Sequence, residues 1–375
     1  MIDFSFPLCE TYTDAIASSS LIKTPPNGWV SGCLYDRNGA IIALSQRFGG
    51  FHGDFFPNSD DETITTDNMI DLPVLSAKSL YLGHFMPHYG HFLVEMLSSF
   101  WMYDKFYSFD HFVFHPFVFG ETYPSYLVEA FKAFGLPLSK IHIIKTQTIL
   151  AEVTIPERLV KLNKSAKNEV RKVYQFLTHT LSTGDSHSIN RCYYISRVRM
   201  SLRSGQRVII NEPFIECVLN KMGFETIYPE LLSLAEQVSL FNQADIICGL
   251  SGSALHNCVF MRPHSLLIEI ADLRSRDTTH PMQMICNNLS NITYHLIPFS
   301  GLVIHQENQL GSISITPLVR RIESIVKQYR VEQGMPNSTR AHSATLERCR
   351  LNTLMIMKNS LRLLKWVLMQ KILRM

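Results

Sequence analysis

The strongest constraint on the fold is the regular alternation of short apolar runs and helical segments between residues 191 and 297. The runs CYYISR, FETIYP, DIICGLS, SLLIEI and ITYHLIP are rich in the apolar and β-branched residues typical of buried strands. Helical segments of about ten residues separate most of them, such as EPFIECVLNKMG, which ends at a glycine. This alternation predicts a parallel, doubly wound sheet.

The first 150 residues also mix strands and helices. The runs GWVSGCLYD and AIIALSQRF flank the turn sequence RNG and predict a hairpin. The expected strand SLYLGHF leads into Pro87, where a helix should begin because proline is favoured in a first helical turn. Two further strands, HFVFHPFVF and KIHIIKT, enclose the helix YLVEAFKAFGL, and a polar helix is expected from about Ser165 to Leu181.

The chain of 375 residues suits two domains of ordinary size, and its 46% hydrophobic content excludes a disordered protein. We expect an α/β fold with an N-terminal domain over residues 1–160 and a Rossmann-like domain over 161–335. A basic tail, residues 336–375, completes the chain.

Charge and cysteine content limit the functional classes. The net charge is +3, but the tail from Thr339 onward holds eight Lys or Arg residues against one acid, Glu347. The domains are therefore mildly acidic, and no nucleic-acid partner is expected. The eight cysteines form no C-x-x-C pair, which predicts reduced thiols in a cytoplasmic protein. Neither a signal peptide nor a membrane-spanning stretch is expected.

The tail itself predicts contact with a membrane surface. Lys358, Arg362 and Lys365 lie close to one face of an apolar helical pattern, as in helices that lie in an anionic membrane surface. The alternative is that the tail packs on the domains. The first interpretation makes the protein peripheral on the inner face of the membrane, and the sequence does not determine the oligomeric state.

The segment ICGLSGSALHN, residues 247–257, carries the most informative turn. A buried strand enters a run of small residues and then a helix, at the edge where open α/β sheets bind ligands. The turn favours phosphate or sugar binding, with tight strand–helix packing as the alternative. A serine nucleophile is a third hypothesis, weakened because Ser253 stands where the G-x-S-x-G pattern needs glycine.

Two further features follow strands of the same predicted sheet. Arg197 and Arg207 belong to a loop rich in arginine, whose guanidinium groups suit diphosphate oxygens. Glu269 ends the strand SLLIEI and could bind ribose hydroxyls. A solvated basic loop and a simple surface glutamate are the corresponding alternatives.

In the first half, GHFMPHYGHFLVEM gathers His84, His88, His91 and Glu95. A helix starting near Pro87 places the last three on one face. Zinc accepts such ligands, but the spacing is not that of a zinc enzyme of the H-E-x-x-H type. The remaining hypotheses are a hydrogen-bonded polar face and acid/base chemistry, since histidine beside a carboxylate can accept a proton near neutral pH.

Taken together in this order, HYGHFLVEMLSSFW, YISR, R-x-x-x-NE, AEQVSLFNQADIICGLSGSALHNCVF and LLIEI resemble glycosyltransferase family 61. The resemblance spans roughly residues 80–300, and several members of that family build bacterial capsules or lipopolysaccharides. It implies a two-domain GT-B enzyme that uses a nucleotide sugar, inverts the anomeric centre and needs no metal. The acceptor would be a surface polysaccharide or glycolipid precursor.

The resemblance also implies roles for individual residues. The family's helix motif falls on His91, Phe92 and Glu95, and its strand-end arginine falls on Arg197. The later motif R-x-x-x-NE falls on Arg207, Asn211 and Glu212, and the family's turn and strand-end glutamate fall on Ser251–Asn257 and Glu269. The expected donor-binding residues are Arg197, Arg207, Asn211, Gly252, Ser253, Ala254, Leu255, Asn257 and Glu269.

The turn keeps Gly252, Leu255 and Asn257 of the family pattern, but Ser253-Ala254 replaces its Ala-Gly and His256 replaces its threonine. The family's histidine there is Ser251 in this chain, so a side-chain contact from that histidine is lost while backbone contacts to a diphosphate can persist. For catalysis, Glu95 or His91 is the expected base, with His88 or His84 orienting it or holding the acceptor. Two other functions compete with this one: a metal-dependent hydrolase using the histidine cluster, and a non-catalytic glycan- or nucleotide-binding protein.

Overall fold

A computed structural model describes residues 1–19, 22–23, 29–30, 32–47, 71–116, 123–183, 191–200, 208–272, 277–300, 303–307 and 310–334. The chain forms two compact units. Unit 1 comprises Met1–Thr183, Ser233–Ser239 and Pro281–Ser290. Unit 2 comprises Gly184–Leu232, Leu240–His280 and Asn291–Met375. The predicted domains, 1–160 and 161–335, stay a prediction, although residues up to Thr183 group with unit 1.

Unit 1 is built on a six-stranded mixed sheet. Its strands in spatial order are β5 (Leu34–Tyr35), β2 (Cys9–Ala17), β9 (Thr148–Pro156), β6 (Val74–Phe85), β7 (His111–Pro116) and β8 (Ile141–Ile143). The last four strands are mutually parallel, whereas β2 runs antiparallel to β9 and to β5. Their apolar residues are buried because alternate positions of a strand face the core.

The smaller elements of unit 1 lie around this sheet. They include helices α2 (Ser125–Ala133) and α3 (Val170–Leu181). Short 3-10 helices cover Ala43–Ser45 and Leu138–Lys140. A second sheet has the order β1 (Ile2–Asp3), β11 (Ser165–Lys167), β10 (Val160–Lys161), and β3 (Ile22–Lys23) pairs antiparallel with β4 (Trp29–Val30). Helix α7 (Pro281–Ser290) also belongs to this unit.

The helical segment after β6 is irregular. It consists of α1 (Tyr89–His91), one π-helical stretch (Phe92–Met96) and a 3-10 segment (Leu97–Ser108) with a kink at Met102. Nearly all of Phe92–Phe100 is buried, so packing rather than regular hydrogen bonding sets its path. A π-helical stretch is a frequent feature of functional sites.

Unit 2 contains the predicted parallel sheet. Its strands in spatial order are β14 (Glu225–Ile227), β12 (Cys192–Ile195), β15 (Ile246–Leu250), β16 (Leu266–Ile270) and β17 (Thr293–Ile297), and every pair is parallel. Strands β15 and β16 are buried at every position, which explains their continuous apolar sequence. The order reverses at β12, the first strand of the sheet along the chain, as in doubly wound folds.

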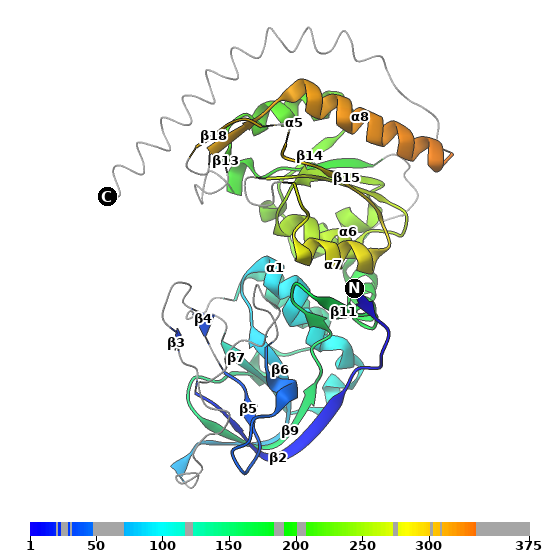
Figure 1. Cartoon of the computed structure of the whole chain (residues 1–375). Coiled ribbons are helices and arrows are strands. Elements are labelled where there is room, and N and C mark those ends of the chain that lie inside the picture. Colours follow the sequence, from blue (N-terminus) through cyan, green and yellow to red (C-terminus); the bar gives the residue numbers. More distant parts are fainter. Residues whose placement is uncertain are drawn as a thin grey trace. The chain divides into compact units, whose positions relative to one another are not determined.

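Helices connect these strands. Helix α5 (Glu212–Lys221) starts with proline in its first turn and ends before Gly223, whose φ of +92° only glycine adopts readily. Helix α8 (Ile315–Glu332) packs with α5 on one face of the sheet, as Figure 1 shows. The other elements are α6 (Leu234–Gln243), 3-10 helices at Pro229–Leu231 and Ser253–Phe260, and a sheet of β13 (Val208–Ile209), β19 (Leu310–Ile313) and β18 (Val303–Glu307).

The α/β fold is therefore confirmed, and the strands expected between residues 192 and 297 are all present. The hairpin around Arg37–Gly39 is confirmed as a turn closed by one bridge between Tyr35 and Ile41. The helix expected from Ser165 was wrong in its first turn: Ser165–Lys167 pairs with β10 as a strand, and α3 begins at Val170. The GT-B arrangement stays a prediction, and the tail lies outside the described residues.

Candidate functional site

Both units place candidate residues at the carboxyl ends of parallel strands. In unit 1 the strand order reverses at β6, which ends with Gly83, His84 and Phe85. In unit 2 it reverses at β12, and Arg197 follows that strand while Ser251 follows β15. Ligands of open α/β sheets bind at such reversals, so each edge is a candidate site.

Glu95 is the centre of the site in unit 1. Its side chain is fully buried in the π-helical stretch. Arg47, which follows the 3-10 helix Ala43–Ser45, clamps it through two hydrogen bonds, Nε to Oε1 and Nη2 to Oε2, each 2.9 Å long. Such a bidentate guanidinium–carboxylate pair is the strongest common geometry for this contact. Nothing in the local sequence around Arg47 pointed to this role.

The surroundings of Glu95 determine its protonation state. Burial alone would raise the pKa of Glu95, but the charge of Arg47 and hydrogen bonds from His91 and Arg47 outweigh it. The net result is a pKa lowered to about 2. Glu95 therefore stays ionised near neutral pH and is a weak proton acceptor.

His91 lies one helical turn before Glu95 and is bound to it. Nδ1 of His91 donates to Oε2 of Glu95 over 2.5 Å, and the imidazole keeps about 25% of its side-chain surface exposed. Because Nδ1 carries the proton, the neutral ring has its lone pair on Nε2. A histidine oriented by a buried carboxylate is a common arrangement for general base catalysis.

His84 occupies a different environment from the one expected of an acceptor-binding residue. It is buried, its Nδ1 lies 3.4 Å from Nη2 of Arg158, and its ring also hydrogen-bonds the backbone of Gly32. Burial, followed by the charge of Arg158, holds the pKa of His84 well below 6.5. His84 is therefore a neutral residue engaged by protein groups, and its predicted contact with the acceptor stays a prediction.

His115, the partner of His84 in the β6–β7 register, extends this network. Its Nε2 lies 3.1 Å from the backbone oxygen of Ser18, which can only accept, so Nε2 carries the proton. Its Nδ1 then accepts from the hydroxyl of Tyr81 over 2.8 Å. Burial lowers the pKa of His115 to about 4. Both histidines are thus neutral at physiological pH.

His88 lies at the start of α1 and is exposed. Partial burial and then the neighbouring His91 lower its pKa. Across the described part of the chain, no group of three or more His, Cys, Asp or Glu side chains is arranged to hold a metal ion. The hypothesis of a metal-dependent hydrolase therefore has no set of ligands in that part.

Arg197 is the central residue of the candidate site in unit 2. Its Nη1 donates to the backbone oxygen of Ser251 over 3.0 Å and to the carboxylate of Asp272 over 3.1 Å. Gly252 packs against this side chain, because a Cβ at that position would lie 3.6 Å from Nε of Arg197. The arginine and the small-residue turn therefore meet, as the sequence predicted.

Glu212, the first residue of α5, fixes the backbone of this arginine. Its Oε1 accepts from the N–H of Arg197 over 2.7 Å and from the hydroxyl of Tyr194 over 3.1 Å. Its Oε2 is buried and has no hydrogen-bond partner among the described residues. Burial raises the pKa of Glu212 to about 7, against the lowering effect of Arg197.

Glu269 lies near the carboxyl end of β16, as predicted, but its carboxylate faces protein groups. The hydroxyl of Ser251 donates to Oε1 and that of Tyr294 to Oε2, each over 2.5 Å. Burial raises the pKa of Glu269, and these hydrogen bonds lower it in part. A ribose hydroxyl would have to share or replace one of these contacts, so ribose binding stays a prediction.

The other predicted donor-binding residues differ in exposure. Ser253 is exposed, Ala254 is half-buried, and Leu255 and Asn257 are buried within the 3-10 helix. Both sides of the Asn211 amide bind the backbone of Ile313 in β19, at 2.7 and 3.0 Å. Arg207 lies outside the described residues.

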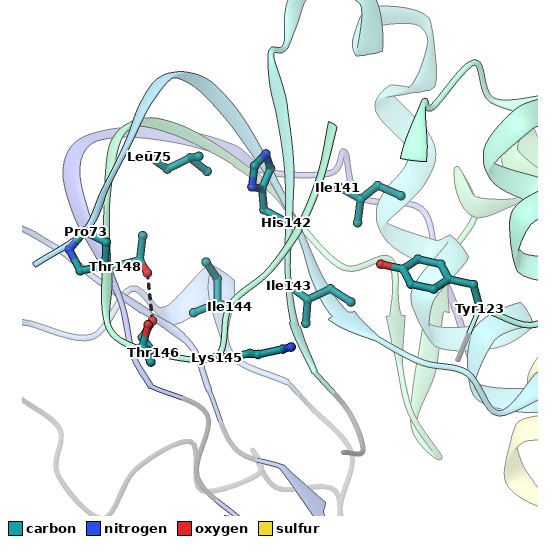
Figure 2. Close-up of a pocket in the computed structure, with 10 residues that line it drawn as sticks. All are labelled: Pro73, Leu75, Tyr123, Ile141, His142, Ile143, Ile144, Lys145, Thr146 and Thr148. Carbon is teal, nitrogen blue, oxygen red and sulfur yellow. Dashed lines mark hydrogen bonds between the residues drawn. The ribbon is translucent and has the colours of Figure 1, made fainter. Parts of the chain in front are cut away.

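A pocket of about 500 Å³ lies elsewhere in unit 1, against the short edge strand β8 (Figure 2). It is lined by Pro73, Leu75, Tyr123, Ile141, His142, Ile143, Ile144, Lys145, Thr146 and Thr148. None of the predicted site residues lines it. The candidate chemistry is therefore associated with the strand ends rather than with this pocket.

Sequence reasoning missed Arg47, Arg158, Asp272 and Tyr294. Each reaches its partner from a distant part of the chain, so no local spacing could indicate it. In the described part of the chain, no helix has the length and apolar character needed to cross a membrane.

Comparison with known families agrees with the sequence resemblance. The family described as glycosyltransferase 61 matches residues 89–268, a range that contains His91, Glu95, Arg197 and the turn after β15. No curated protein matches the chain. The match begins in helix α1 of unit 1 and ends within β16 of unit 2. Residues 89–268 of this chain therefore belong to glycosyltransferase family 61.

Proposed function

We propose that this protein is an inverting glycosyltransferase that moves a sugar from a nucleotide-sugar donor to a glycan or lipid-linked acceptor. The observation that carries the proposal is the hydrogen bond between His91 and the buried Glu95, two residues within the range that matches glycosyltransferase family 61, together with the clamp that Arg47 places on Glu95. Transfer with inversion needs one base for the acceptor hydroxyl, and a histidine oriented by a carboxylate can supply it.

His91 is the proposed base. Its Nε2 takes the proton from the acceptor hydroxyl while that oxygen forms a bond to the anomeric carbon of the donor. The bond between this carbon and the nucleotide diphosphate breaks, and its electron pair leaves on the diphosphate. Glu95 stabilises the imidazolium that results, and Arg47 keeps Glu95 ionised and in place.

Unit 2 is proposed to hold the donor, in the division of roles typical of GT-B enzymes. Arg197 would neutralise charge that develops on the departing diphosphate. The backbone of the turn at Gly252–Leu255 would contact the same group. The fixed position of Arg197 between Ser251 and Asp272 supports this role because a preorganised charge needs no rearrangement during reaction.

The cellular role is proposed to be assembly of a surface polysaccharide or glycolipid precursor at the cytoplasmic face of a membrane. Its basis is the resemblance together with the basic, apolar pattern of residues 336–375. Binding of the full chain to anionic vesicles, compared with a chain that ends at residue 335, tests this role.

The catalytic proposal is tested by turnover and thermal-shift measurements with UDP-, GDP-, CMP- and CDP-sugars. His91→Gln should lower kcat by about 10²- to 10⁴-fold while donor binding persists, and the exposed His179→Gln is the matched control. Arg197→Ala should abolish stabilisation by the donor. Donor binding without turnover in the wild type would instead favour a non-catalytic binding protein. Loss of activity on adding EDTA would favour the hydrolase.

A further inference from the structure

Arg158 is a half-buried cation that the catalytic proposal does not use. It follows β9, and its guanidinium lies across Gly83 at the end of the neighbouring strand β6. A Cβ at position 83 would approach Nη2 of Arg158 more closely than 3.0 Å, and Gly83 has a φ of +83°. Glycine at this position therefore permits both the backbone conformation and the close approach of the arginine.

The hydrogen bonding of this guanidinium is incomplete. Its Nη2 makes one long contact, 3.4 Å, to Nδ1 of His84. Its Nη1 is buried and has no hydrogen-bond partner among the residues that the structure describes. Buried polar groups are nearly always paired, and a charged one left unpaired is costly. Among the described residues, Nη1 therefore keeps its capacity to donate a hydrogen bond to a further group.

The surrounding charges do not balance either. Glu95 interacts electrostatically with both Arg47 and Arg158, but both of its oxygens are already bound by Arg47. His84 is held neutral, and a guanidinium keeps its proton in proteins even where burial lowers its pKa. Among the described residues, one positive charge at the end of β6 is thus left without a hydrogen-bonded anion.

We propose that Arg158 binds an anionic group of the acceptor, either a sugar carboxylate or a phosphate, and thereby positions the acceptor hydroxyl for His91. A guanidinium fork matches both groups because each presents two oxygens at a suitable spacing. The electrostatic coupling of Arg158 to Glu95, which holds His91, associates this site with the proposed base. The role in positioning the acceptor depends on the proposed function, whereas the anion site does not.

The first test measures thermal unfolding of the full chain with inorganic phosphate, glucuronate or glucose. Wild type should be stabilised by phosphate or glucuronate and not by glucose. Arg158→Met should lose the response, while Arg37→Met, which removes an exposed charge from the same unit, should keep it. Arg197→Ala should also keep it, which separates this site from a phosphate site in unit 2. The more effective anion identifies whether the acceptor group is a carboxylate or a phosphate.

Stability without ligand separates a binding role from a structural one. Removing an unpaired buried charge does not destabilise a protein, so the midpoint of Arg158→Met should equal or exceed that of wild type. A lower midpoint, combined with no response of wild type to either anion, would overturn the proposal. An anion response that persists in Arg158→Met would overturn it as well.

Kinetics then test the positioning role. Arg158→Met should raise KM for an anionic acceptor by about 10- to 100-fold, the range of one charge-assisted hydrogen bond. KM for the donor should not change. A rise in donor KM alone would assign Arg158 to the donor and contradict the inference. Arg158-dependent anion binding in a protein without transferase activity would refute the proposed function but leave the anion site intact.

Discussion

The ion pair between Arg47 and Glu95 allows a quantitative test of how unit 1 holds its proposed base. We consider Arg47→Met, which keeps much of the side-chain volume but removes the charge and both hydrogen bonds to Glu95. The carboxylate then remains in a fully buried position without the cation that hydrogen-bonds both of its oxygens. A buried charge that loses its partner is strongly destabilising.

Two routes lead to a similar magnitude. The pKa of Glu95 falls from 4.5 to about 2 in the folded protein, which corresponds to about 3 kcal/mol at about 1.4 kcal/mol per unit. Removal of one partner from a buried ion pair costs about 3–5 kcal/mol. We therefore expect Arg47→Met to lower the free energy of unfolding of unit 1 by about 3–5 kcal/mol at pH 7.

The pH dependence has a defined sign. In wild type, the lowered pKa of Glu95 contributes stability that is present above pH 4.5 and is lost as the pH falls toward 2. In Arg47→Met, burial becomes the dominant influence, so the pKa of Glu95 rises and protonation relieves the buried charge as the pH falls. The difference in stability between the two proteins should therefore shrink between pH 8 and pH 5.

Urea denaturation followed by tryptophan fluorescence measures these differences, since Trp29 and Trp101 belong to unit 1. The double variant Arg47→Met/Glu95→Gln is the control, because it removes the stranded charge and should regain most of the lost stability. A loss below about 1 kcal/mol for the single variant, the value of an exposed pair, would refute the reasoning. A double variant as unstable as the single one would do the same.

Two further predictions concern backbone conformation and proton binding. In chemical denaturation, Gly83→Ala should destabilise unit 1 by more than Gly135→Ala. Both glycines have a positive φ, but only Gly83 has another side chain packed against it. The backbone strain alone, in Gly135→Ala, should cost about 1 kcal/mol. Equal losses would contradict the close contact. Glu212 has a pKa raised to about 7, so its protonated form stabilises the folded protein at low pH and this contribution is lost as the pH rises through 7. The free energy of unfolding should fall by about 2–3 kcal/mol between pH 5 and pH 8 for this reason. Glu212→Gln should flatten this dependence for unit 2, and an unchanged pH profile would show that Glu212 titrates normally.

The sequence determined those features whose physical cause is local. The strands of unit 2 were predictable because a strand buried on both faces is apolar throughout, as in IICGL and LLIEI. Helix α5 was predictable from its proline and Gly223, and the turn at Arg37–Gly39 from its composition. The contact between His91 and Glu95 was foreseeable as well, since residues four apart in a helix are neighbours.

Other features depended on distant residues and could not be predicted from local pattern. Ser165–Lys167 has a helix-like sequence but forms a strand, because Ala166 pairs with Val160 and Ile2 on its two sides. The apolar spacing after β6 correctly predicted a helical segment. It did not predict the π-helical and 3-10 hydrogen bonding, because the burial of Phe92–Phe100 sets the path of this segment.

The division of roles within the candidate site was decided by tertiary structure alone. From sequence, Glu95 and His91 were equal candidates for the base. Arg47 lies 48 positions from Glu95 in the chain and keeps Glu95 ionised, which favours His91 as the base. Arg158 likewise reaches His84 from 74 positions away. Periodicity records which face of an element is buried, because every turn or pleat repeats that requirement. A single contact between two residues that are distant in the chain leaves no repeating pattern in the sequence. It can therefore be recognised only when the fold brings the two residues together.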